Sequence, residues 1–236
     1  MNFAATPTPI KKIKPWYRHW WAMILWFVLT FFAIVFIAMA FVFVDAVKKA
    51  KSEISIFGDT PRFENTEGVG NYWFGSAKPV VTIVEFADFS CPFSKSSFTK
   101  IRELGNKYKG QVKVIYRDFP YISENSVELA LSARCAGEQG LFWPMHDMLF
   151  QNQGITDQTQ VLALANQLAL DQTRFAKCLT DQKYLPQIKA DVADAEKFGI
   201  EGAPTWFING YMIAGDMTVS VMEKIVTDLV GQSNKK

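Results

Sequence analysis

The chain has 236 residues, of which 49% are apolar and 20% charged, and its 25 Lys and Arg against 23 Asp and Glu leave a formal net charge of +2. This balance excludes an acidic disordered tail protein, and the lack of a long basic stripe argues against a nucleic-acid partner. The aromatic content of 14% is high for a soluble domain, and the apolar residues are not evenly spread.

Residues 22–44 form a continuous apolar stretch without Asp, Glu, Lys or Arg. As a helix this stretch would be roughly 35 Å long, enough to cross a hydrocarbon core of about 30 Å. We therefore predict one transmembrane anchor at 22–44. A buried core helix is the alternative, but such a helix rarely runs so long without a polar face. A cleaved signal peptide fits less well, because its apolar region is about 7–15 residues long.

The charges that flank this stretch predict its orientation. Four cationic residues precede it and three follow it: Lys11, Lys12, Lys14 and Arg18, then Lys48, Lys49 and Lys51. The small excess favours a cytoplasmic N-terminus. We expect a cytoplasmic tail at 1–21, a stalk and irregular lead-in at 45–75, and one compact domain at 76–236 in the periplasm or outside the cell.

The compact domain is expected to begin with a strand, a helix and a second strand. Residues 80–86 are an almost continuous run of β-branched and apolar residues, which is typical of a buried strand. Pro92 suits the first turn of a helix, so a helix is predicted from Cys91 or Pro92 to about Tyr108. Residues 112–116 form the second strand, and the two strands should be parallel.

A helical region follows, at about 122–198, with Ser123, Asp157 and Asp171 as candidate N-caps and several Gly and Pro residues as breaks. Asn209-Gly210 then separates two apolar runs, which predicts a hairpin with a type I′ turn. A last amphipathic helix is expected at about 219–230. The order is that of an α/β protein with the thioredoxin fold, a helical domain inserted in its middle, and one transmembrane helix before it.

Cys91 is the first candidate for chemistry, because it lies where the first strand ends and the helix begins. The free amides and the dipole of a helix N-terminus stabilise a thiolate. The alternative is that Cys91 is a buried cysteine that only packs in the core and has no chemical role. The position after a buried parallel strand favours function, since ligands and reactive groups gather at that edge of a sheet.

Three segments carry a resemblance to a known family. Residues 81–94 (VTIVEFADFSCPFS), residues 138–147 (EQGLFWPMHD) and residues 202–210 (GAPTWFING) occur in this order. Together they resemble the DsbA-type thiol–disulfide oxidoreductases of the thioredoxin superfamily, over about residues 76–230.

The resemblance implies a role for each matching residue. Cys91 would be the nucleophile and Glu85 a buried acid that takes and returns protons; an edge-strand or paired carboxylate is the alternative for Glu85. Pro204 would be a cis proline facing Cys91. Client peptides would bind along the residues around these two, which are Pro92, Phe93, Ala203, Pro204 and Thr205.

Ser94 departs from the family motif, which has a second cysteine at this position. Cys91 and Ser94 cannot form a disulfide, so a dithiol oxidase is not expected. Ser94 is instead expected to donate a hydrogen bond to the Cys91 thiolate. The sequence thus predicts a monothiol disulfide isomerase or reductase that acts on exported proteins, with a membrane redox partner as a further candidate. A non-catalytic peptide-binding chaperone or assembly factor is the alternative.

The two remaining cysteines are expected to pair with each other. An oxidising compartment favours a structural disulfide between Cys135 and Cys178, which leaves Cys91 free; two separate buried thiols are the alternative. The sequence has only two His, His19 and His146, and no cluster at metal-ligand spacing. No metal site and no cofactor are therefore predicted, and His146 is interpreted as a structural residue.

Overall fold

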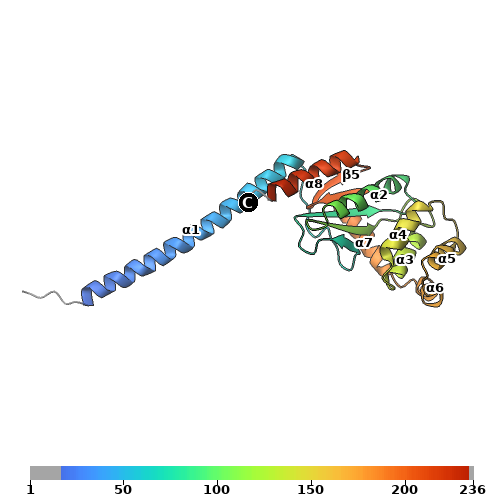
Figure 1. The fold of residues 1–236 in the computed structure, drawn as a ribbon, viewed down its shortest axis with the longest axis horizontal. Helices are drawn as coiled ribbons and strands as arrows, with labels where there is room; N and C mark the ends of the chain where they lie inside the picture. The colour runs from blue at the N-terminus through green and yellow to red at the C-terminus, as the bar shows by residue number, and fades with distance from the viewer. Residues whose placement is uncertain (1–16, 234–236) are drawn as a thin grey trace, which may run out of the picture. The chain divides into compact units, whose positions relative to one another are not determined.

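The computed structural model describes residues 17–233 and divides into two compact units, residues 1–53 and 54–236. The predicted tail at 1–21 therefore lies mostly outside the described residues. Helix α1 (Tyr17–Phe57) opens the described part (Figure 1). It continues past residue 44, so the first part of the predicted stalk is helical.

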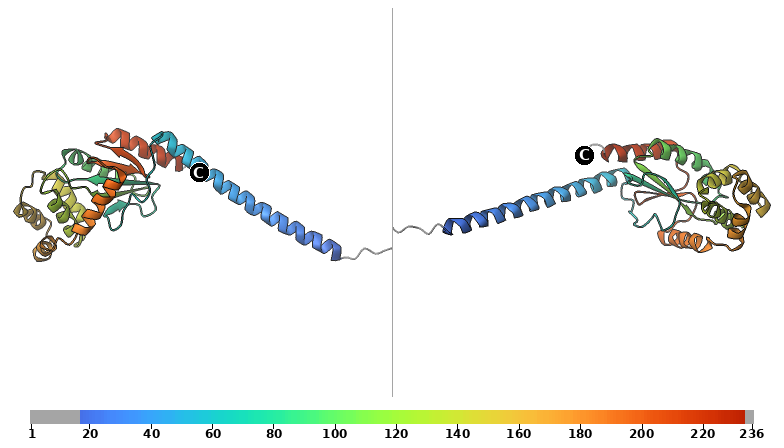
Figure 2. Two further views of the ribbon diagram at one scale, coloured as in Figure 1. Left: turned by 180° about the vertical axis from the view of Figure 1, so that it is seen from behind. Right: turned by 60° about the horizontal axis from the view of Figure 1, so that its bottom comes forward.

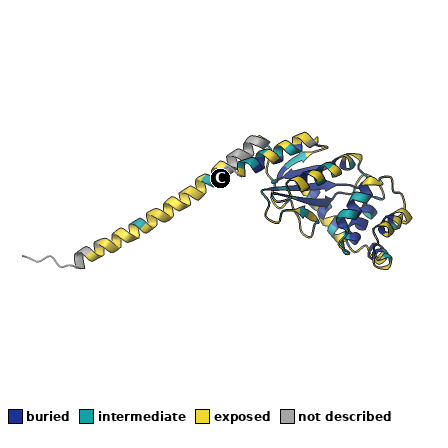
Figure 3. Cartoon of the chain, in the orientation of Figure 1, coloured by how far each residue is buried: buried dark blue, intermediate teal, exposed yellow. Residues whose placement is uncertain are grey.

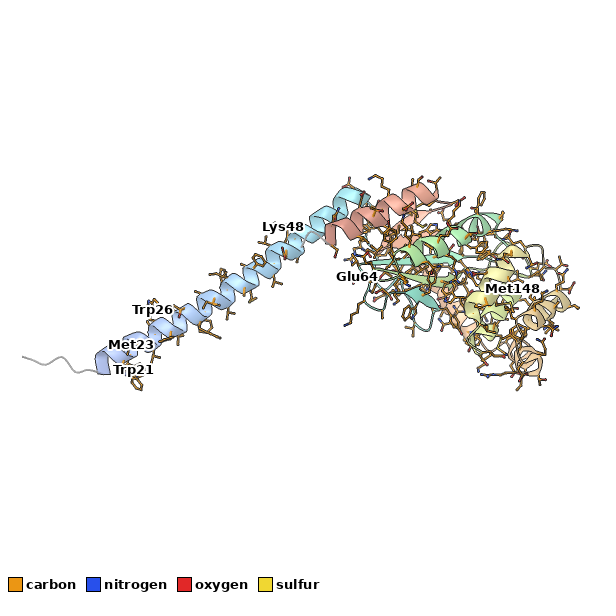
Figure 4. The ribbon with its side chains drawn as sticks, viewed as in Figure 1. Trp21, Met23, Trp26, Lys48, Glu64 and Met148 are labelled. Atoms are coloured by element: carbon orange, nitrogen blue, oxygen red, sulfur yellow. A yellow bond between two sulfur atoms is a disulfide. The ribbon has the colours of Figure 1, made fainter. Side chains whose placement is uncertain are left out.

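Helix α1 contains one segment, Met23–Lys48, that is long and apolar enough to cross a membrane. None of its described side chains is buried (Figure 3), and Trp21, Met23 and Trp26 project from the helix (Figure 4). A long apolar segment whose described side chains are exposed is typical of a membrane span, because in water such a surface would be covered.

A five-stranded sheet forms the centre of the second unit, in the order β1-β3-β2-β4-β5. Its strands are β1 (Trp73–Gly75), β2 (Val81–Ala87), β3 (Val112–Asp118), β4 (Thr205–Ile208) and β5 (Tyr211–Ala214). The central pair β2–β3 is parallel, and the other pairs are antiparallel. This arrangement confirms the predicted fold class and the parallel strand pair.

Strand β1 lies in the segment that the sequence analysis treated as an irregular lead-in. It pairs with β3, with Phe74 opposite Val114. Gly75 ends the strand with φ at +101°, and a Cβ there would lie 2.2 Å from the Val112 carbonyl oxygen. The chain passes so close to β3 at this point that only glycine fits.

Helices cover both faces of the sheet. They are α2 (Pro92–Lys107), α3 (Ser126–Gly137), α4 (Phe142–Gln151), α5 (Gln158–Gln167), α6 (Gln172–Thr180), α7 (Leu185–Phe198) and α8 (Val219–Ser233). Helices α2 and α8 lie side by side on one face (Figures 1 and 2), over buried residues such as Ile83, Val114 and Trp206. Helix α7 covers the other face, against Phe86 and Phe207.

Local sequence explains where α5 and α6 begin and why β4 and β5 form a hairpin. Asp157 and Asp171 accept hydrogen bonds from backbone amides in the first turns of α5 and α6, as N-caps do. Ser123 is not an N-cap, which corrects the prediction: α3 starts three residues later, and the Ser123 amide donates to Ser126 Oγ. Asn209 and Gly210 have φ at 50° and 88°, as the predicted type I′ turn requires.

A buried cluster of charges ties β3 to α3 and α7. Asp191 accepts hydrogen bonds from Arg117 Nε at 2.8 Å and from Arg134 Nη2 at 2.6 Å. Arg134 also pairs with Asp118. Burial is the main cause that raises the pKa of Asp118 to about 6, and Arg134 opposes this rise. The cluster fixes α3 and α7 against the carboxyl end of β3.

Candidate active site

Cys91 occupies the junction between the central strand β2 and helix α2. It is the N-cap residue of α2, with φ −80° and ψ 121°, and Pro92 follows at the first helical position. The residue is 1% exposed. Of the three cysteines in the chain, Cys91 alone carries a free thiol, because Cys135 and Cys178 form a disulfide between α3 and α6.

Two polar side chains hold the loop that carries Cys91. Asp88 is buried, and its carboxylate accepts hydrogen bonds of 2.8 Å from the amides of Ser90, Tyr121 and Ile122. Gln153 Nε2 donates to the carbonyl oxygens of Phe89 and Cys91, at 2.9 and 2.8 Å. Neither residue was predicted from the sequence as part of the site. Only the position of Asp88, three residues before Cys91, offered a signal.

The loop before strand β4 faces the thiol. The Ala203–Pro204 peptide bond is cis. Cys91 Sγ donates to the Ala203 carbonyl oxygen at 3.2 Å, and the Ala203 amide donates to Tyr121 Oη at 3.1 Å. Thr205 Oγ1 donates to the Gly202 carbonyl oxygen at 2.7 Å. The structure thus brings Cys91 next to the Ala203–Pro204 loop, although Cys91 and Ala203 lie 112 residues apart in the chain.

Ser94 is fully buried at the third position of α2, and none of the residues that the structure describes forms a hydrogen bond with its Oγ. The expected hydrogen bond between Ser94 and Cys91 is therefore absent. The thiol proton is directed to Ala203 instead. Ser94 thus contributes a small buried hydroxyl to the first turn of α2.

Glu85 lies on β2 beneath α2 and is 2% exposed. Its Oε1 accepts a hydrogen bond of 3.2 Å from Ser97 Oγ. Burial raises the pKa of Glu85 to about 8, although the Ser97 hydroxyl acts in the opposite direction. A carboxyl group with such a pKa can hold or release a proton near neutral pH.

Exposed apolar side chains surround the thiol loop. Phe93 is 61% exposed, Tyr121 48% and Ile122 43%. Pro92 is also exposed. These residues come from the first turn of α2 and from the loop after β3 that Asp88 holds. An apolar surface of this kind suits the side chains of an unfolded or extended chain.

Among the residues that the structure describes, no group of three or more His, Cys, Asp and Glu could hold a metal ion. His146 is fully buried among aromatic rings, and its Nδ1 contacts Asp147 Oδ1 at 2.8 Å. Burial lowers the pKa of His146, so the imidazole is neutral at pH 7. Within the described part of the chain, His146 Nε2 has no hydrogen-bond partner.

The sheet order, the inserted helices and a cysteine opposite a cis-proline loop define a class: proteins with the thioredoxin fold. The chain belongs to the thioredoxin family, whose profile matches residues 67–228. A solved structure with this fold is the thiol-disulfide exchange protein alpha-DsbA2 from Wolbachia pipientis. It has a TM-score of 0.64 and 23% identity, over 78% of this chain and 97% of that one.

Two kinds of curated relatives are similar in sequence. One is the Na(+)/H(+) antiporter NhaA 1 of Salinispora arenicola, 32% identical over 65% of this chain. The match spans only 24% of that relative's length. The other is the probable disulfide bond formation protein D of Bacillus anthracis, 29% identical over 58% of this chain and 68% of that protein.

Proposed function

We propose that this chain is a membrane-anchored monothiol enzyme that exchanges disulfides in exported proteins through Cys91. The observation that carries the proposal is the free thiol at the N-cap of α2, hydrogen-bonded to the Ala203 carbonyl beside cis-Pro204. The names of the Bacillus and Wolbachia proteins support thiol–disulfide chemistry of this general kind.

The reaction begins when the Cys91 thiolate attacks one sulfur of a client disulfide. A mixed disulfide forms between Cys91 and the client, and the other client sulfur leaves as a thiolate. In isomerisation, a client thiolate attacks the sulfur of the client cysteine that is bound to Cys91. A new client disulfide forms, Cys91 is released, and no net oxidation takes place. In reduction, a low-molecular-weight thiolate attacks the Cys91 sulfur of the mixed disulfide and releases the second client cysteine as a thiolate. A second low-molecular-weight thiolate then attacks the small thiol's sulfur that is bound to Cys91, which frees Cys91 and forms the disulfide of the small thiol.

Glu85 is proposed as the proton store for these steps. Its pKa of about 8 lets it accept the proton when Cys91 ionises and donate it back when Cys91 becomes a thiol again. Ser94 is proposed to keep the site in monothiol form, since the hydroxyl cannot resolve the mixed disulfide. The anchor at 22–44 would hold the domain outside the cytoplasm, where client disulfides persist.

The test is to trap clients in intact cells that express the full chain. Rapid acid quenching and thiol blocking should preserve adducts that dithiothreitol releases, and Cys91→Ala should abolish them. A Ser96→Ala variant changes an exposed residue of the same helix turn and should keep them. Absence of adducts from the unaltered chain would refute the enzymatic proposal.

A non-catalytic peptide-binding chaperone is the second candidate. Two observations favour it: Cys91 is only 1% exposed, and the apolar side chains of Phe93, Tyr121 and Ile122 are open to solvent. In that case Cys91→Ala would still capture clients without a covalent bond, and no dithiothreitol-sensitive adduct would form with the unaltered chain.

A further inference from the structure

Ala203 has two backbone polar groups, and each is satisfied by a side chain rather than by the sheet. The β2–β4 ladder ends at the pair Phe86–Thr205, so Ala203 lies beyond the last paired residue. Its amide donates to Tyr121 Oη at 3.1 Å, and its carbonyl accepts from Cys91 Sγ at 3.2 Å. Pro204, the next residue, has no amide to offer.

An extended peptide that binds along this loop needs the same two groups. Strand addition uses backbone hydrogen bonds, so a client carbonyl would accept from the Ala203 amide and a client amide would donate to the Ala203 carbonyl. The Cys91 thiol gives up its hydrogen bond when it ionises or enters a mixed disulfide. The reaction does not break the hydrogen bond between the Ala203 amide and the Tyr121 hydroxyl. This hydroxyl therefore competes with the client carbonyl for the Ala203 amide.

Tyr121 is built to move without disturbing the loop. Its backbone amide is held by the Asp88 carboxylate at 2.8 Å, and its side chain is 48% exposed. Its ring packs against Phe119 at a centroid distance of 4.9 Å. Rotation of the side chain toward solvent would break one hydrogen bond and leave the Asp88 contacts in place.

We propose that Tyr121 is a latch on the Ala203–Pro204 loop: its hydroxyl occupies the Ala203 amide, and an extended peptide binds by displacing it. The proposal rests on the proposed function for the peptide-binding role of this loop. The latch lowers the affinity for any peptide that cannot replace this hydrogen bond with its own, so it selects extended backbone over folded surfaces. Tyr121 is thus a specificity-determining residue.

The test compares peptide binding by the full chain in nanodiscs with that of Tyr121→Phe, which keeps the ring and removes the hydroxyl. The probe is a fluorescein-labelled extended peptide with apolar residues around a central Ser, so no disulfide can form. Loss of one competing hydrogen bond should tighten binding about 2- to 10-fold in anisotropy titrations. Tyr108→Phe is the matched control, because its hydroxyl contacts Thr227 at the far end of α2.

Hydrogen exchange of the Ala203 amide gives a second readout. Exchange should be faster in Tyr121→Phe than in the unaltered chain, and saturating peptide should slow it in both. Unchanged or weaker peptide binding in Tyr121→Phe overturns the latch, as does absence of binding in both chains or unchanged Ala203 exchange. Reaction of Cys91 with a small aromatic disulfide separates the two proposals. An inert Cys91 with tighter peptide binding removes only the thiol chemistry, and a reactive Cys91 with unchanged binding removes only the latch.

Discussion

Replacement of Ser94 by Cys should convert the monothiol site into a dithiol site. Cys91 is the N-cap of α2 and Ser94 is its third helical residue. The side chain of an N-cap residue lies next to the third residue of the helix, as capping hydrogen bonds show. Ser94 is fully buried and its Oγ has no partner, so a thiol at this position loses no hydrogen bond. We expect the reduced variant to fold normally.

The structure sets the size of the expected change in stability. Closing a loop of about four residues stabilises the folded state by about 2 kcal/mol in the chain-entropy model. The new disulfide removes the hydrogen bond from Cys91 Sγ to Ala203, which contributes about 1 kcal/mol. The oxidised variant should therefore be more stable than the reduced one by only about 1 kcal/mol.

The assay equilibrates the Ser94→Cys chain in glutathione buffers, blocks free thiols and measures the mass. An intramolecular disulfide should form, and the variant should oxidise a reduced substrate protein. Ser96→Cys is the matched control. Ser96 is exposed, its hydroxyl donates a hydrogen bond to Asp216, and it points away from Ser94 because residues two apart in a helix lie on opposite faces. The Ser96→Cys variant should therefore keep two free thiols. Two free thiols in Ser94→Cys at every glutathione ratio, or equal disulfide formation in Ser96→Cys, would refute the reasoning.

Four further changes test other parts of the structure. Cys135→Ala with Cys178→Ala removes the disulfide across 43 residues and should lower the free energy of unfolding by about 4 kcal/mol in denaturant titrations, while non-reducing peptide mapping of the unaltered chain should recover the pair. Glu85 ionises near 4.5 in the unfolded chain and at about 8 in the folded one, so the folded state loses stability as pH rises through this window. Glu85→Gln cannot ionise at this position. The free energy of unfolding of Glu85→Gln minus that of the unaltered chain should therefore rise by up to about 5 kcal/mol between pH 4.5 and 8. A difference that stays constant with pH contradicts this. Asp191→Ala leaves two buried arginines without their shared partner and should cost about 3–5 kcal/mol, whereas Asp194→Ala, at a partly exposed carboxylate, should cost less than about 1 kcal/mol. Alkaline phosphatase fused after residue 236 should be active if the domain lies outside the cytoplasm, and an inactive fusion reverses the predicted orientation.

The elements around Cys91 could be predicted because local patterns specify them. The apolar run at 80–86, Pro92 at a helix start and Asn209-Gly210 in a turn are each set by neighbours in the chain, and β2, α2 and the β4–β5 hairpin follow these signals. Strand β1 could not be predicted in this way. It has three residues, and its pairing with β3 depends on the close approach of Gly75 to Val112.

The polar framework of the site could not be read from local patterns. Asp88, Gln153 and Tyr121 act through contacts with residues 33–82 positions away. Arg117 and Arg134 resemble ordinary surface residues in the sequence, yet both are 1% exposed because Asp191 lies between them in space. Side chains of this kind become recognisable only once the fold brings their partners together. Among the described residues, the expected Ser94–Cys91 hydrogen bond does not form; the Cys91 thiol donates to the Ala203 carbonyl, 112 residues away in the chain, which no local pattern indicates.

The most direct test of thiol exchange at Cys91 is its rate of reaction with a peptide disulfide. The full chain in nanodiscs and the same chain unfolded in urea would be mixed with an extended peptide whose cysteine carries an aromatic thiol leaving group, and the adducts would be mapped by mass spectrometry. The account predicts one adduct, at Cys91, that dithiothreitol removes and that forms faster in the folded chain than in the unfolded one. A slower reaction in the folded chain would contradict it, because the fold would then shield Cys91 rather than activate it.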